Sequence, residues 1–142
     1  METKRLWTPA FINYGISSGI FYMTQYVLVA ALPIVLTSDL EGSAVDAGLA
    51  MTYFQIGTIL CRPFAGRLID SFDKLYILLL STALFFIIMG LFNFTASLNT
   101  IFVLRGLHGI VFALATTVMA ALAVLVLPNE RKGEGINMFA VL

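Results

Sequence analysis

Arg105 lies inside a long apolar stretch, where a charged side chain needs a partner or a chemical role. A guanidinium at the centre of a membrane helix costs roughly 2.5–3.5 kcal/mol on insertion scales, so it should face other helices and be paired or hydrated. We expect Gln25 as its first partner and Tyr22 as its second. Neither is acidic, so the charge remains uncompensated and can act on a proton- or substrate-binding group. The alternative is an arginine that extends to the outer headgroups.

Two of the apolar stretches carry polar and aromatic residues at the spacing of one helix face. The residues that share a face are, in the first stretch, Tyr14, Ser18, Tyr22 and Gln25, and in the second, Arg105, His108 or Gly109, Phe112 and Thr116. Helices that face a watery cavity carry such residues, whereas helices that face lipid can be uniformly apolar. We therefore expect these two helices to line a cavity. The alternative is a static bundle in which these groups only satisfy one another.

Other kinds of chemistry lack the residues they need. The sequence contains no nucleophile–base pair, zinc ligand set or phosphate-binding loop, and its single cysteine excludes a disulfide framework. Eight basic and eight acidic side chains cancel, so no net field attracts nucleic acid. We expect neither an enzyme nor a protein that binds a metal, a cofactor or nucleic acid.

The elements that position these residues are predicted to be membrane-spanning helices. Hydrophobic residues make up 60% of the 142 positions and charged residues only 11%. A bilayer core requires about 20 apolar residues in a helix, and the charges fall in short clusters between runs of that length. The predicted spans cover residues 11–36, 47–69, 75–96 and 100–127, and a fifth helix starts near residue 136. The fold class is therefore all-α integral membrane, without a soluble domain. Period-2 alternation, which a β-barrel requires, is absent.

The distribution of lysine and arginine predicts the orientation. All loop-proximal basic residues lie before the first span, between the second and third, or after the fourth. By the positive-inside rule these segments are cytosolic, so the N-terminus is cytosolic and the protein is a multi-pass protein of the cell membrane. Arg62 and Arg67 are expected at the end of the second span, with their side chains extended to the headgroups. The first apolar run is longer than that of a cleaved signal peptide.

The connection between the second and third spans carries the clearest motif. It reads GRLIDSFDK and resembles the G-x-L-a-D-r-x-G-r-k signature of the major facilitator superfamily. The positions that match are Gly66, Leu68, Asp70 and Lys74. Ser71 replaces a usual basic residue, and Asp73 replaces the usual glycine. Because aspartate tolerates left-handed backbone conformations, we expect Asp73 to preserve the tight turn.

Two further segments resemble the same superfamily. Arg105, His108 and Gly109 are similar to the R-x-x-q/h-G motif, which is found especially in drug–proton antiporters, and they form a candidate coupling site. The segment PNERKGEG after the fourth span is similar to the connector that opens the fifth helix. The motifs occur in the expected order, so the chain is identified as a member of the superfamily, most like the drug–proton antiporters.

The resemblance implies a secondary active transporter that works by alternating access. The matched loop implies a gating role for Gly66, Leu68, Asp70 and Lys74. Aromatic and weakly polar lining residues suit a small organic, partly hydrophobic substrate, and proton-coupled efflux is the leading expectation. The expected partners are the lipid bilayer, this substrate, protons and the remainder of the transporter. We expect residues 1–142 to be an incomplete N-terminal six-helix half.

Two alternatives remain open from the sequence. One is a metabolite importer of the same superfamily. The other is a self-contained four-helix membrane protein, such as a small multidrug transporter that functions as a dimer. Those transporters depend on an acidic residue in the first helix, and the first span here contains neither aspartate nor glutamate.

Overall fold

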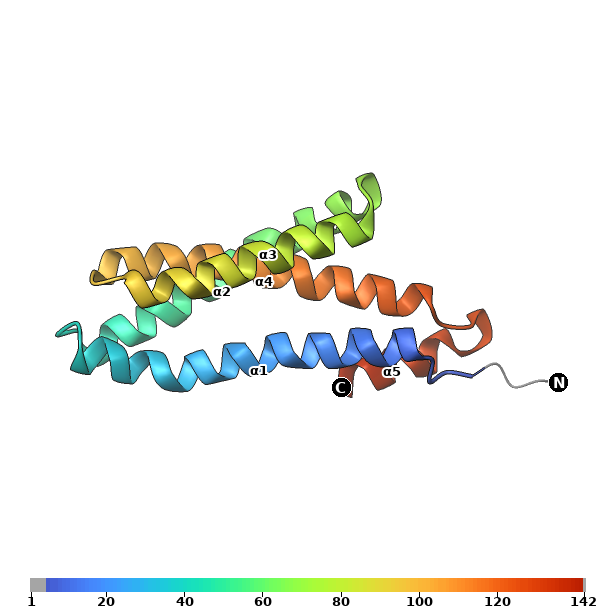
Figure 1. Ribbon diagram of the computed structural model, residues 1–142, viewed down its shortest axis with the longest axis horizontal. Helices are drawn as coiled ribbons and strands as arrows, with labels where there is room; N and C mark the ends of the chain where they lie inside the picture. The colour runs from blue at the N-terminus through green and yellow to red at the C-terminus, as the bar shows by residue number, and fades with distance from the viewer. Residues whose placement is uncertain (1–4, 142) are drawn as a thin grey trace.

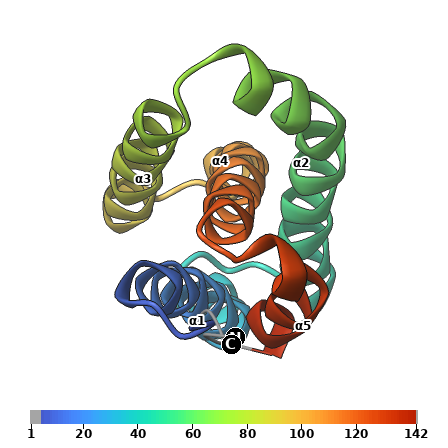
Figure 2. The same ribbon diagram turned by 90° about the vertical axis from the view of Figure 1, so that its right-hand side faces the viewer.

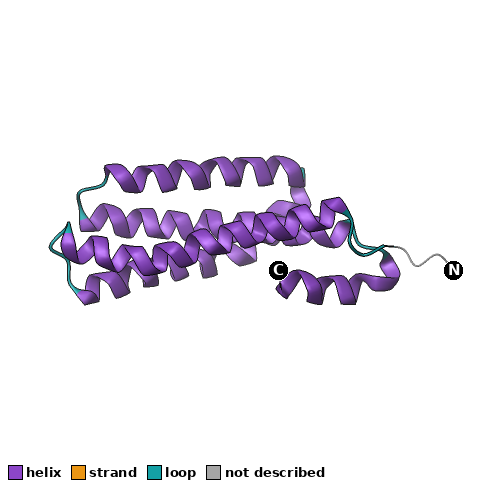
Figure 3. Cartoon of the chain, turned by 60° about the horizontal axis from the view of Figure 1, so that its bottom comes forward, coloured by secondary structure: helices purple, strands orange, loops and turns teal. Residues whose placement is uncertain are grey.

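The structure is a computed structural model that describes residues 5–141, and in this range it consists of helices joined by short turns (Figure 1). The helices are α1 (Pro9–Ser38), α2 (Ala44–Ser71), α3 (Lys74–Leu91), α4 (Leu98–Leu125) and α5 (Lys132–Val141), with 3-10 turns η1 (Phe92–Phe94) and η2 (Asn129–Arg131). No strand is present among the described residues (Figure 3). Four helices are long and apolar enough to cross a membrane. The all-α membrane class is confirmed.

α1 and α2 extend beyond the spans expected from hydropathy because polar residues cap them. α3 and α4 instead end at Leu91 and Leu125, before the expected ends at residues 96 and 127. Ser43 and Asp46 form a reciprocal capping box at the start of α2, in which each side chain accepts a hydrogen bond from the other residue's backbone N–H. The Thr8 side chain caps α1 in front of Pro9, which has the backbone geometry that a first helical turn needs. Capping therefore accounts for the N-terminal residues of α1 and α2 that lie outside the apolar stretches.

The predicted start of the fifth helix near residue 136 is wrong, because α5 begins at Lys132. Arg131 donates two hydrogen bonds to the Glu134 carboxylate, at 2.8 Å and 2.7 Å. These bonds lower the pKa of Glu134, whose negative charge also suits the first turn of a helix. Charged residues thus form the first turn, four residues before the apolar part that marked the helix in the sequence.

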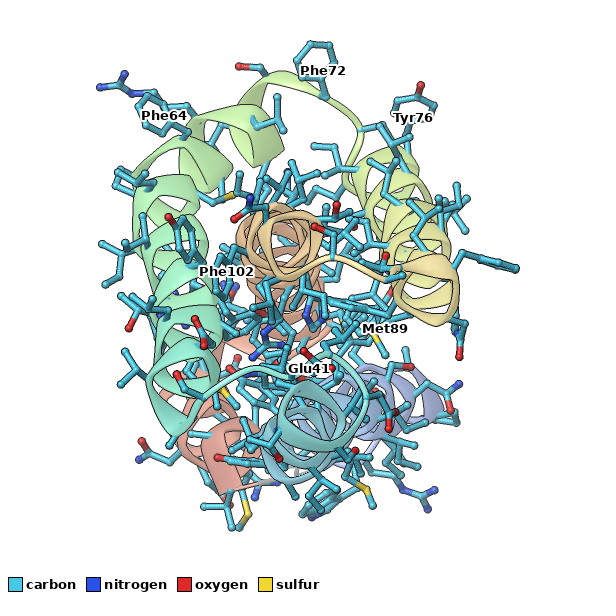
Figure 4. All side chains as sticks on the ribbon, turned by 90° about the vertical axis from the view of Figure 1, so that its left-hand side faces the viewer. Glu41, Phe64, Phe72, Tyr76, Met89 and Phe102 are labelled. Carbon is cyan, nitrogen blue, oxygen red and sulfur yellow. The ribbon has the colours of Figure 1, made fainter. Side chains whose placement is uncertain are left out.

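α4 is the central helix of the bundle. In the end-on view it lies inside a ring formed by the other helices (Figure 2). Sixty-one per cent of its apolar span is buried, against 22–28% for the other three spans. The ring helices bury only their inner faces. Phe64 on α2, Phe72 in the turn after it and Tyr76 on α3 are exposed and point away from the bundle (Figure 4).

Glycines bring α2 and α4 into backbone contact. A Cβ atom added at Gly57 would overlap the carbonyl oxygen of Gly106, and one added at Gly109 would overlap that of Phe54. Thr58 donates a hydrogen bond across the same interface to the Gly109 carbonyl, over 3.3 Å. Small residues permit this close approach between membrane helices, which is stabilised by van der Waals contact and hydrogen bonding. The crossing fixes the part of α4 that carries Arg105 and His108.

Candidate functional site

Arg105 is fully buried, and every partner the structure gives it is formally neutral. One terminal guanidinium nitrogen donates to Oε1 of Gln25 over 3.2 Å, and Nε donates to the Ala50 carbonyl over 3.4 Å. The other terminal nitrogen lies 3.3 Å from the sulfur of Met51. The guanidinium carbon also lies 4.7 Å from the centre of the Phe54 ring, within the range of a cation–π contact. The expected contact between Arg105 and Gln25 is confirmed.

No carboxylate pairs with Arg105 within residues 5–141. α1 and α4 contain no aspartate or glutamate at all. Dipoles of an amide, a peptide carbonyl and an aromatic ring therefore solvate the charge without neutralising it. Tyr22, the second expected partner, instead packs its ring edge-on against Phe112, with ring centres 5.2 Å apart.

His108 is buried next to Arg105 among aromatic rings. Its Nδ1 lies 3.2 Å from a terminal nitrogen of Arg105. Since a guanidinium only donates, Nδ1 accepts this hydrogen bond, and the neutral imidazole carries its hydrogen on Nε2. Nε2 has no partner among the described residues. The ring centres of Phe85 and Phe54 lie 5.0 Å and 5.2 Å from that of His108, so apolar surfaces enclose the imidazole.

A cavity of about 800 Å³ lies between α1, α4 and α5. Its polar and aromatic lining consists of Ser18, Tyr22 and Tyr26 from α1, Thr116 and Thr117 from α4, Phe139 from α5, and Arg62 from α2. Three residues that the sequence proposed as cavity-lining, Ser18, Tyr22 and Thr116, are among them. The hydroxyls of both threonines donate back to carbonyls of their own helix. The cavity is large enough for a drug-sized organic molecule.

The other three proposed lining residues are not part of this cavity's wall. Gln25 is buried and bonds to Arg105. Phe112 belongs to the buried cluster between α1, α2, α3 and α4. Tyr14, near the N-terminal end of α1, packs against two further apolar clusters. The predicted polar face of α1 thus divides between the cavity and the interior of the bundle.

The match to known protein families covers nearly all of the described structure. The family model of the Major Facilitator Superfamily matches residues 14–142, from the first turns of α1 through α5. The chain belongs to the major facilitator superfamily. No curated protein and no solved structure matches it. The superfamily is one of secondary transporters rather than enzymes, so the chain comes from a secondary transporter.

The superfamily signature between α2 and α3 lies at one end of the bundle. Lys74 donates a hydrogen bond to the Ile69 carbonyl over 3.2 Å, and this favours its positive charge at the C-terminus of α2. Asp70 is exposed, as are Gly66 and Leu68. These residues form an exposed surface next to the turn. Their predicted role in gating is not tested by the contacts within this chain.

Asp73 preserves this turn in a different way from the one expected. A left-handed conformation was predicted, but its backbone is extended, with φ −62° and ψ 126°. Its side chain accepts a hydrogen bond from the backbone N–H of Tyr76 over 3.0 Å and so caps α3. The superfamily glycine is thus replaced by a residue that begins the next helix, because aspartate can satisfy a free N–H there.

Arg62 is a cavity-lining residue of this transporter that the sequence pattern did not identify. It was expected at the end of the second span with its side chain among headgroups. α2 ends at Ser71, two residues beyond the expected end of the span, and Arg62, nine residues before Ser71, lines the cavity. The sequence pattern did not identify this role because polar faces were sought only on the first and fourth spans, whereas Arg62 reaches the cavity from α2.

Proposed function

We propose that this transporter exports small, partly hydrophobic organic solutes across the cell membrane in exchange for protons. The cavity beside α1 and α4 binds the solute, and alternating access exposes it to either side in turn. The N-terminus is cytosolic, and the remainder of the transporter completes the cavity. The helix-four motif supports the antiporter branch by its resemblance to drug–proton antiporters.

The observation that carries this proposal is the buried, uncompensated charge of Arg105. In a medium of low dielectric constant, a fixed positive charge acts strongly on nearby groups. It favours release of a proton from an acidic group that moves next to it, and it favours proton uptake when that group moves away. A conformational change that alters this separation therefore couples proton movement to transport. Gln25 orients the guanidinium without cancelling its charge.

The test uses the full-length gene product in sealed proteoliposomes with an imposed pH gradient. An organic solute should accumulate when the lumen is acidic, since protons that leave drive the solute in. A protonophore should abolish the accumulation. Accumulation with an acidic exterior would instead indicate proton symport and favour the importer. Equal transport with an acidic lumen and with an acidic exterior would exclude proton coupling.

A further inference from the structure

The charges around the cavity are all of one sign. Arg62 is the one charged residue in its lining, which contains no aspartate or glutamate. Within residues 5–141, Arg62 has no hydrogen-bond or ion-pair partner, and its side chain is exposed. Arg105 adds a second uncompensated positive charge in the same bundle, at the interface of α4 with α1 and α2. An organic cation would therefore meet repulsion here, whereas an anion would be attracted.

Arg62 lies at the level of two other polar lining residues, Ser18 and Thr116. It is nine residues before Ser71, the last residue of α2, and Thr116 is nine residues before Leu125, the last residue of α4. Ser18 is nine residues after Pro9, the first residue of α1. These three helix ends lie at one end of the bundle, so all three side chains are about 14 Å from it, at 1.5 Å per residue. A charge at this depth within a span is costly unless a counter-charge or water meets it.

We propose that the cavity binds organic monoanions, in particular carboxylates attached to an aromatic or apolar body, and that Arg62 binds the carboxylate. This rests on the proposed function, in which the cavity is the substrate site. The planar guanidinium can donate two parallel hydrogen bonds to one carboxylate. Tyr22, Tyr26 and Phe139 supply aromatic surface for the apolar body.

The lining fits a single carboxylate better than a polyanion. One arginine matches one bidentate anion, and the remaining polar groups of the wall are hydroxyls. The Thr116 and Thr117 hydroxyls are already engaged with backbone carbonyls. Additional negative charges on a substrate would therefore lose their hydration without gaining a cationic partner in the cavity wall. The substrate class follows from this balance of one charge and several aromatic rings.

The test measures binding of three probes with the same naphthalene body and different head groups to the purified full-length transporter: 2-naphthoate, 2-naphthylmethylammonium and 2-naphthalenemethanol. Ligand-induced thermal stabilisation, titrated for each probe, gives the relative affinities. Naphthoate should bind most tightly, and Arg62→Gln should weaken its binding about 10- to 100-fold, as expected for loss of a charge-assisted hydrogen bond. Arg62→Lys should retain part of this affinity, because it keeps the charge but loses the planar fork.

Arg67→Gln is the matched control, since Arg67 lies on the same helix but does not line the cavity. It should leave naphthoate binding unchanged. Equal or tighter binding of the ammonium probe to the wild-type protein would overturn the proposal, and this comparison needs no variant. Unchanged naphthoate binding by Arg62→Gln, or no binding of naphthoate at all, would also overturn it.

Transport assays separate this inference from the function on which it rests. Naphthoate binding that depends on Arg62, without proton-driven transport, would support the anion site and contradict the proposed exchange. Proton-driven transport of the ammonium probe that is insensitive to Arg62→Gln would support the exchange and overturn the anion site.

Discussion

The guanidinium of Arg105 on α4 donates a hydrogen bond to the side-chain oxygen of Gln25 on α1, across 3.2 Å and 80 positions of sequence. Both side chains are buried. The bond therefore joins the central helix of the bundle to a ring helix at a site without a carboxylate. Each helix satisfies a polar group that the other would otherwise leave without a partner.

Replacement of Gln25 tests what this bond contributes. Gln25→Leu should lower the thermal stability of the purified protein, because loss of the acceptor leaves a buried donor unsatisfied at a cost of about 1–3 kcal/mol. Gln25→Glu should retain the bond but impair proton-driven transport, since a carboxylate neutralises Arg105. Thr24→Ala is the control, because Thr24 is half-buried and its hydroxyl bonds only to the Ile20 carbonyl of its own helix. Full proton-driven transport by Gln25→Glu would contradict the proposed role of the charge.

Arg105 itself should tolerate no substitution. Arg105→Ala removes the charge, and Arg105→Lys keeps it but cannot reproduce the three directions in which the guanidinium now donates. Both variants should lose gradient-driven uptake in proteoliposomes while reaching the membrane in normal amounts, as measured by immunoblot. If Arg105→Ala transports at close to the wild-type rate, the residue has no part in coupling.

The crossing of α2 and α4 should be sensitive to a single methyl group. Gly57→Ala places a Cβ against the Gly106 carbonyl oxygen, so the two backbones must separate. Overpacking of this kind costs about 1–3 kcal/mol, and the melting temperature should fall accordingly. Gly48→Ala, on the same helix with open space around it, should leave the melting temperature unchanged or raise it slightly. Equal melting temperatures for the two variants would argue against the tight crossing.

Asp70 is expected to act outside this chain. It is exposed, has no hydrogen-bond or ion-pair partner within residues 5–141, and lies at the negative end of the α2 dipole. We therefore predict that it pairs with a basic group or helix N-terminus elsewhere in the transporter. Asp70→Asn should reduce transport at similar membrane abundance. Asp73→Asn should be near normal, because asparagine also caps a helix. Wild-type transport by Asp70→Asn would leave Asp70 as a hydrated loop charge.

The predicted orientation can be measured by cysteine labelling in intact cells, in a Cys61→Ala background. Ser43→Cys, in the turn before α2, should react with an impermeant thiol reagent, and Asn129→Cys, in the turn after α4, should not. The two positions lie at opposite ends of the bundle because three membrane crossings, by α2, α3 and α4, separate them. The reverse pattern would invert the topology, and labelling of both would contradict a spanning bundle.

The sequence alone was sufficient for the fold class, the family and one long-range contact. Charge clusters between long apolar runs indicate helical spans, because each helix satisfies its own backbone hydrogen bonds and needs no knowledge of its neighbours. The Arg105–Gln25 pair could be predicted because both residues lie at a similar depth below the same membrane boundary. A helical rise of 1.5 Å per residue gives this depth before any packing is known. The motif in the α2–α3 turn could also be recognised from the sequence, because its residues are consecutive in the chain.

Only the tertiary structure decided which face of each helix lies against the cavity and which lies against a neighbouring helix. The sequence predicted that the polar faces of α1 and α4 line one cavity. Ser18, Tyr22 and Thr116 do line it, whereas Gln25 and Phe112 are buried against neighbouring helices. Arg62, expected among the headgroups, lines the cavity together with residues of α1, α4 and α5. Periodicity identifies the residues that share a face, but the partner of that face depends on how the helices cross. Here the glycine contacts between α2 and α4, which no hydropathy pattern shows, determine the crossing.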